Sequence, residues 1–243
     1  MTTTLLLRLA GPMQSWGTQS RFRDRDTTQE PSKSGVIGLL CAALGRPREA
    51  SVTDLCALRM GVRVDRPGVV RVDYQTAGGA HRRGETYGVA RAENPGTETA
   101  LSRRAFLADA SFLVGLEANT PEQATLLRQL NGALAAPVWP LFLGRKSYVP
   151  SEPIRLPDAP PDGPGLREVT LEDALRDYPM MPSSARDISR ARLVIECDAT
   201  HVGAERRNDW PLSFESANRR FATRYVAVSL LPLTQVAADA EKR

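Results

Sequence analysis

The only two histidines, His81 and His201, are the side chains best suited to acid–base chemistry near neutral pH. His81 could act as a general base with Tyr87 and Lys146, because attack of a ribose 2′-hydroxyl on a phosphodiester needs only proton transfer and charge stabilisation. The alternative is that His81 is an ordinary solvent-facing residue of a basic loop, and a structural role is expected for His201. The sequence contains no HExxH, GxSxG, P-loop or dinucleotide-binding motif, so no catalytic site is predicted.

The three cysteines, Cys41, Cys56 and Cys197, indicate neither a disulfide framework nor a zinc site. Their number is odd and no CxxC spacing occurs. We expect all three to be buried as small hydrophobic side chains. No metal or other cofactor is expected.

An anion-binding site is predicted where a basic, hydroxyl-rich loop meets an apolar helix. The stretch 31–45 reads PSKSGVIGLLCAALG, and a helix is expected from an N-cap at Ser34 to a stop at Gly45. A helix N-terminus offers unsatisfied N–H groups and a partial positive charge, so it binds phosphate readily. The alternative is a plain serine-capped core helix. The candidate ligands at this start are Ser32, Lys33, Ser34 and Gly35.

Basic residues are clustered along the chain, which has a formal net charge of +4. Arginine heavily outnumbers lysine, as expected of a surface that contacts phosphates bidentately, although a GC-rich genome produces the same bias. A second glycine turn followed by donors, LGRKS, resembles the first anion site in build. The clusters are Arg21, Arg23 and Arg25; Arg82 and Arg83; Arg103 and Arg104; Gly144, Arg145, Lys146 and Ser147; and a C-terminal group in the range 206–224.

The order of elements that must position these residues predicts an α+β fold. Strands are expected at 4–10, 58–65, 69–76, 110–118, 138–150, 191–199 and 224–233, and helices at 34–45 and 121–134. Pro67 and Gly68 predict a hairpin between the second and third strands. The pattern is that of a βαββαβ unit whose antiparallel sheet is covered by helices on one face.

One domain, 1–243, is expected, with three segments outside the regular pattern. The glycine-rich range 77–102 is a long excursion between two strands, and such loops are usually functional. The proline-rich range 156–190 is expected to be an irregular surface segment, and 237–243 a frayed tail. No apolar run reaches the length of a membrane span and no signal peptide begins the chain, so a cytoplasmic location without membrane contact is expected.

Six segments, in order along the chain, resemble the CasD subunits of type I-E CRISPR Cascade complexes: RLAGPMQSWG (8–17), 31–45, DYQT (73–76), RRAFLADASFLVGL (103–116), LFLGRKS (141–147) and NRRFATRYVAV (218–228). The resemblance implies a RAMP-type protein with a ferredoxin-like (RRM-like) domain and a long β-hairpin thumb, here 77–102. It implies a non-catalytic subunit that holds the 5′ handle of the crRNA and supports antiviral defence. The partners implied are the crRNA, the backbone subunit CasC, the large subunit CasA and, through the complex, target DNA.

The same resemblance makes the two anion sites and the basic clusters candidates for RNA contact. It adds Gln14 and Trp16, although Trp16 could equally be a core or subunit-interface aromatic. No RNP1-like run is present, so stacking of bases on sheet aromatics is not supported. A related CRISPR subtype uses the equivalent subunit as a nuclease, and the alternative function is therefore a metal-independent endoribonuclease acting on crRNA precursor. The RNA-contact candidates are Gln14, Trp16, Arg21, Arg23, Arg25, Ser32, Lys33, Ser34, Gly35, His81, Arg82, Arg83, Arg103, Arg104, Gly144, Arg145, Lys146 and Ser147.

Overall fold

The computed structural model describes residues 2–19, 23–77, 79–82, 85–87, 99–158, 163–180 and 190–232, and the side chains within 78–98 lie outside this description. Helices and strands alternate irregularly along the chain. Their order is β1 (Thr3–Gln14), β2 (Asp24–Arg25), α1 (Lys33–Leu44), α2 (Thr53–Cys56), β3 (Arg59–Arg66), β4 (Val69–Ala77), β5 (Gly79–Arg82), β6 (Glu85–Tyr87), β7 (Ala100–Ala118), α3 (Pro121–Ala135), β8 (Leu166–Arg167), α4 (Leu171–Asp177), β9 (Arg190–Cys197), β10 (Glu205–Ser213) and β11 (Arg220–Pro232).

A large sheet, antiparallel except at β2, forms the body, which confirms the expected α+β class. Its strand order is β10-β11-β9-β3-β7-β1-β8. The long strand β7 is the spine, because β1 and then β2 pair along one of its edges, and β3 and then β4 along the other. The edge strand β10 was not expected from the sequence.

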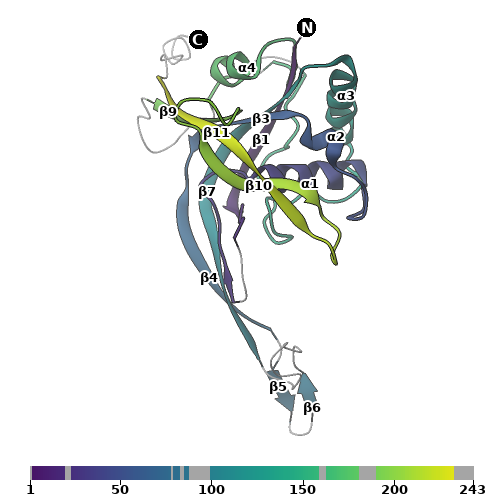
Figure 1. Cartoon of the computed structure of the whole chain (residues 1–243). Coiled ribbons are helices and arrows are strands. Elements are labelled where there is room, and N and C mark those ends of the chain that lie inside the picture. The colour runs from purple at the N-terminus through teal and green to yellow at the C-terminus, as the bar shows by residue number, and fades with distance from the viewer. Residues whose placement is uncertain are drawn as a thin grey trace, which may run out of the picture.

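Strands β3 and β4 do not form the hairpin that Pro67 and Gly68 predicted. Both pair with β7, β3 at Arg59 to Arg66 and β4 at Val69 to Ala77, so they follow one another along the same partner. Gly68 has φ of 70°, a value that favours glycine, and a Cβ there would lie 2.7 Å from the backbone oxygen of Ala108. The turn therefore bends the chain without reversing it, and β4 with β7 forms an arm that projects from the body and carries β5 and β6 at its end (Figure 1).

Hydrophobic residues pack on both faces of the sheet, which corrects the expectation of helices on one face. Successive side chains of β1 point into different cores, because side chains along a strand alternate between the two faces of the sheet. Leu5 and Leu7 join the core under α1, α2 and α3, whereas Leu6 joins a second core with α4. Gly61 of β3 is paired with Gly115 of β7. These two glycines leave room for α4, because a Cβ on either would lie within 2.7 Å of a leucine side chain of α4.

Two further segments differ from the sequence prediction. The described part of 156–190 contains α4 and the buried Leu156, so it contributes to the second core. No strand forms in 138–150; this segment is a loop fixed to β1, where the backbone N–H of Ser15 donates to Leu143 O at 3.0 Å and that of Ser151 donates to Ala10 O at 2.9 Å. The tail 237–243 lies outside the described residues.

Among the described residues, no helix is both long enough and apolar enough to cross a lipid bilayer.

Candidate functional site

The start of α1 is capped by groups of the protein itself, which is the arrangement of the alternative reading, a serine-capped core helix. The N-cap is Ser32, not Ser34, and its hydroxyl accepts from the N–H of Gly35 at 3.3 Å. The backbone N–H of Lys33 donates to Asp209 Oδ2 at 2.7 Å. Arg224 holds both oxygens of this buried carboxylate, at 2.7 and 2.9 Å. A carboxylate therefore already occupies the position that a phosphate would take at the first amide.

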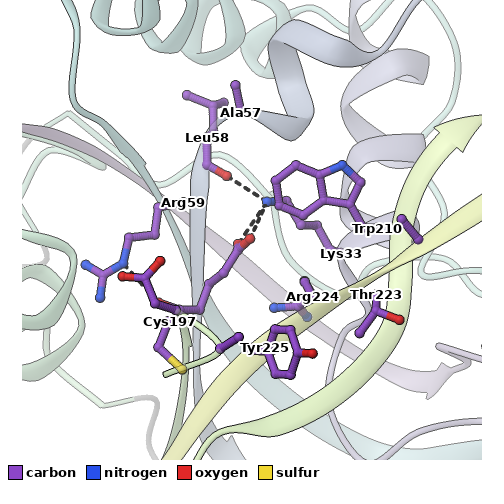
Figure 2. A pocket seen from close by; sticks show the side chains of 13 residues that line it. Lys33, Ala57, Leu58, Arg59, Cys197, Trp210, Thr223, Arg224 and Tyr225 are labelled. Atoms are coloured by element: carbon purple, nitrogen blue, oxygen red, sulfur yellow. Dashed lines mark hydrogen bonds and ion pairs between the residues drawn. The ribbon is translucent and has the colours of Figure 1, made fainter. Parts of the chain in front are cut away.

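The side chain of Lys33 points into the protein and not toward a position where it could contact a phosphate at the start of α1. Its ammonium is fully buried, donates to Leu58 O at 3.0 Å and to both oxygens of Glu196 at 2.8 and 2.9 Å, and lies 3.8 Å from the ring centroid of Trp210 (Figure 2). Burial lowers the pKa of Lys33, and Glu196 opposes this shift. Lys33 is one of the residues that line a pocket of about 500 Å³. The charge of Lys33 is therefore paired inside the protein with Glu196, which does not favour the phosphate contact predicted for it.

Gln14 and Trp16 lie in the core, which favours the alternative left open for Trp16, a core aromatic, over the contacts with RNA that the resemblance implies. Gln14 donates to Leu9 O at 3.0 Å and to Ala110 O at 2.8 Å, and accepts from Trp16 Nε1 at 3.2 Å. Trp16 is 1% exposed. The ring of Trp16 accounts for the glycine at position 35, because a Cβ on Gly35 would lie 2.7 Å from this ring. This glycine permits close packing against Trp16.

The two anion motifs of the sequence meet in one polar pocket of about 350 Å³. Ser34 lines it from α1, and Gly144 and Lys146 line it from the loop at 143–147. Gly144 has φ of 96°, and a Cβ there would lie 1.8 Å from the oxygen of Ser15, so only glycine lets this loop approach β1 so closely. The sequence predicted two separate sites of similar build, and it held no sign that the two motifs share one pocket.

The pocket also contains Arg48, Phe214 and Arg219, of which the sequence analysis noted only Arg219, as part of the C-terminal basic group. Arg48 follows α1, whereas Phe214 and Arg219 lie on the turn between β10 and β11. Arg48, Arg219 and Lys146 are all exposed, and their charges gather around the pocket. The β10–β11 turn is brought here by Asp209 and Trp210 of β10, which contact Lys33 at the start of α1.

The remaining residues of the second motif have separate positions. Arg145 is half-buried and donates to the hydroxyl of Tyr148 at 2.8 Å and to Ala105 O at 3.0 Å, so it fastens the loop to β7. Ser147 is exposed and does not line the pocket. Lys146 is therefore the cation of this motif that faces the pocket.

A second basic surface lies where β2 pairs with β7, and we call Arg23, Arg25, Arg103 and Arg104 the arginine ridge. Asp24 pairs with Arg103, and Arg25 pairs with Arg104. Arg23, Arg25 and Arg103 are exposed, whereas Arg104 is half-buried and donates to Ser102 Oγ at 3.0 Å. The ridge adjoins the polar pocket, because Ser15 of the pocket wall donates to Ala105 O at 3.3 Å.

Some predicted residues cannot be placed. Arg21 and Arg83 lie outside the described residues, and for His81, Arg82 and Tyr87 only the backbone of β5 and β6 is described. His201 is exposed in a turn, where its N–H donates to Asp198 O at 3.1 Å. Within the described part of the chain, no three His, Cys, Asp or Glu side chains are arranged to hold a metal ion.

The expectation of three buried cysteines is confirmed for two of them. Cys41 and Cys56 are buried, and burial raises the pKa of each thiol to about 11. Cys197 is only partly buried, because it lies at the end of β9 where the sheet opens to solvent.

The sequence and the fold of the chain correspond to those of a known protein family. The model of the family described as CRISPR-associated protein (Cas_Cas5) matches residues 4–227, and the chain belongs to this family. It is 36% identical over 168 residues to the CRISPR system Cascade subunit CasD of Escherichia coli (strain K12). This alignment covers 64% of this chain and 71% of that protein.

Two solved structures share the fold. One, described as the crystal structure of a Cas protein, is 44% identical with a TM-score of 0.71, and the match covers 95% of each chain. A chain of a CRISPR RNA-guided surveillance complex is 34% identical with a TM-score of 0.74, and the match covers 95% of this chain and 90% of that one. The resemblance to CasD drawn from the sequence is thereby confirmed.

Proposed function

We propose that this chain is the crRNA-binding subunit of a Cascade complex and that its polar pocket and arginine ridge hold the 5′ handle of the crRNA. The observation that carries the site assignment is the grouping of Lys146, Arg48 and Arg219 around one pocket, next to the arginine ridge. Several exposed guanidinium and ammonium groups in one region of the surface suit the phosphates of a single strand. The assignment of function is supported by the family match and by the CasD relative.

The central part of the sheet supports a ferredoxin-like assignment of the fold. The strands β3, β7, β1 and β8 are adjacent in that order, and α1 follows β1 while α3 follows β7. In a βαββαβ unit this corresponds to the order second, third, first and fourth strand. On this assignment β9, β10 and β11 extend the sheet beyond the unit, and the very short β8 is the fourth strand.

The arm is proposed as the thumb, which contacts the neighbouring subunits CasC and CasA. Supporting this, β4 exposes Val70, Val72 and Tyr74 at alternate positions, with 51 to 61% of each residue accessible. Large hydrophobic side chains exposed together on one element favour a protein contact. Of the arginine ridge, Arg103 adjoins this strip, because it pairs with Tyr74. A partner subunit could therefore cover the arm while RNA follows the ridge.

The proposed role is binding without catalysis, in the cytoplasm, with target DNA reached only through the complex. The Escherichia coli relative is named as a Cascade subunit. Among the described residues that line the pocket, no nucleophilic side chain is hydrogen-bonded to a basic one. Incubation of the purified chain with precursor RNA in chelator is expected to give no products. Cleavage within the repeat that disappears in His81→Ala would instead favour the metal-independent endoribonuclease.

The site is tested by the salt dependence of RNA binding. Lys146→Ala and Arg219→Ala are each expected to weaken binding of single-stranded RNA and to reduce the slope of log Kd against log salt by about 0.7, the contribution of one phosphate contact. The matched control is Arg128→Ala on the exposed face of α3, which should leave affinity and slope unchanged. Unchanged slopes in both pocket variants would contradict the proposed site.

A further inference from the structure

The floor of the polar pocket is a bare stretch of helix backbone at Gly38. A Cβ built on Gly38 meets nothing within 4 Å, whereas one on Gly35, three residues earlier, would contact the ring of Trp16. Glycine in a helix interior is destabilising relative to alanine. Packing within the chain gives no reason for Gly38, so the space above it is left open at a cost in stability.

The surroundings of Gly38 combine several apolar side chains with hydroxyl and cationic groups. Ala42, one helical turn further, and Pro140 and Phe142 of the facing loop line the same pocket. Phe214 lines it from the β10–β11 turn and contacts Phe221 edge-on, with ring centroids 6.4 Å apart. At about 350 Å³ the pocket has the size of a small-molecule site. Beside its polar groups, the pocket therefore offers apolar side chains to one planar group and cations to the charge attached to that group.

We infer that this pocket takes one unpaired nucleotide of the bound RNA, with the base inserted over the backbone of Gly38 and its phosphate held by Lys146 and Arg219. Single-stranded RNA is recognised mainly through bases that are splayed out of the stack and laid against flat side chains. Gly38 is then a size-determining residue, because any side chain at this position would fill the space of the base. The inference rests on the proposed function and adds a base-sized subsite to it.

The test compares two ligands and two glycines. Binding of the full chain is measured with a fluorescein-labelled single-stranded oligoadenylate and with an oligomer of the same length in which every residue is abasic. Gly38→Leu is expected to weaken oligoadenylate binding about tenfold, the effect of losing one stacked base, and to leave binding of the abasic oligomer and the salt slope unchanged. The matched control is Gly132→Leu, since Gly132 is also helical and also meets nothing within 4 Å of an added Cβ.

A second variant keeps the test valid if leucine disturbs the fold. Gly38→Ala should raise the melting temperature, because alanine favours the helix, and should still weaken oligoadenylate binding about threefold. Equal loss for both ligands would overturn the inference in favour of a phosphate-only site. Normal oligoadenylate binding by Gly38→Leu would also overturn the inference. If that variant then failed to enter the assembled complex, the pocket would be assigned to a side chain of a partner subunit.

The outcomes separate this inference from the proposed function. If Lys146→Ala lowers affinity and salt slope while Gly38→Leu changes nothing, the RNA site stands and only the base subsite fails. If neither variant changes binding, the polar pocket is not the RNA site and both fail together.

Discussion

The carboxylate of Asp209 accepts a hydrogen bond from the backbone N–H of Lys33 at 2.7 Å, across 176 residues of sequence. The side chain of the same lysine is paired with Glu196. Two contacts of one residue thus join α1 to β9 and β10, and they place the β10–β11 turn, with Phe214 and Arg219, beside the polar pocket. A residue that resembles a phosphate ligand in the sequence therefore organises the site from inside the protein.

Lys33→Met is expected to lower the free energy of unfolding by about 3–5 kcal/mol, because it leaves the carboxylate of Glu196 buried without its partner. The measurement is urea unfolding. Lys33→Met combined with Glu196→Leu should recover most of the loss, since both charges are then removed. The folded Lys33→Met chain should bind RNA with an unchanged salt slope. A slope reduced by about 0.7 would restore Lys33 as a phosphate ligand.

The pair Arg46–Asp54 makes stability depend on pH in the acid range. The hydrogen bond from Arg46, at 2.6–2.7 Å, holds the pKa of Asp54 below its usual value of 3.8. A carboxyl with a lowered pKa in the folded state contributes stability above its unfolded pKa and loses it as pH falls through the folded pKa. Asp54→Asn should therefore cost up to about 1 kcal/mol at neutral pH, discounted for exposure, and nothing once the pH has fallen well below the folded-state pKa of Asp54.

Urea unfolding at several pH values checks this prediction, with Arg46→Gln as the matched variant. In the Arg46→Gln background, Asp54→Asn should have little effect at any pH, because the interaction is already absent. An effect of Asp54→Asn that persists unchanged in acid would assign its role to the helix cap of α2 instead of the ion pair.

The elements that the sequence predicted well are those with local signals. The helix α3 has a Thr120 cap whose hydroxyl accepts from Gln123 N–H, a proline in its first turn and leucines at helical spacing, and all are readable in one stretch. The apolar run 36–44 predicted a buried α1 equally well. Its N-cap was misplaced by two residues, because Ser32 and Ser34 are both good capping residues.

The parts that failed depend on contacts distant in sequence. Pro67 and Gly68 are good hairpin signals, but the pairing of β4 with β7 instead of β3 is decided by β7, which begins 32 residues after Gly68. Lys33 resembles a surface donor until Glu196 and Trp210 are placed beside it. The polar pocket assembles four separate segments, so Arg219 and Phe214 gave no local sign of their role.

Gly35→Ala is expected to destabilise the chain, although alanine favours helices. Its Cβ would lie 2.7 Å from the ring of Trp16, which cannot move freely because Gln14 holds its indole N–H. Overpacking of this kind costs about 1–3 kcal/mol, against a gain of about 1 kcal/mol in helix propensity. Thermal melting should show a lower midpoint than in wild type. Gly132→Ala is the control and should raise the midpoint; a rise in both variants would contradict the tight packing of Trp16 on α1.

The last prediction concerns the arm. Ala77 of β4 and Ala100 of β7 are paired, so residues 78–99 can be replaced by an Asn-Gly turn that closes the hairpin at this register. The melting temperature should change by less than about 4 °C, because the two hydrophobic cores lie in the body and remain intact. When the shortened chain is co-expressed with the other Cascade subunits and crRNA, we expect it to be absent from the purified complex.

As a control, Val72→Asp with Tyr74→Ala keeps the full length and alters only the exposed strip of β4. Assembly lost in the shortened chain alone assigns the contact to 78–99, assembly lost in both extends it to the strip, and normal assembly of the shortened chain would contradict the proposed thumb.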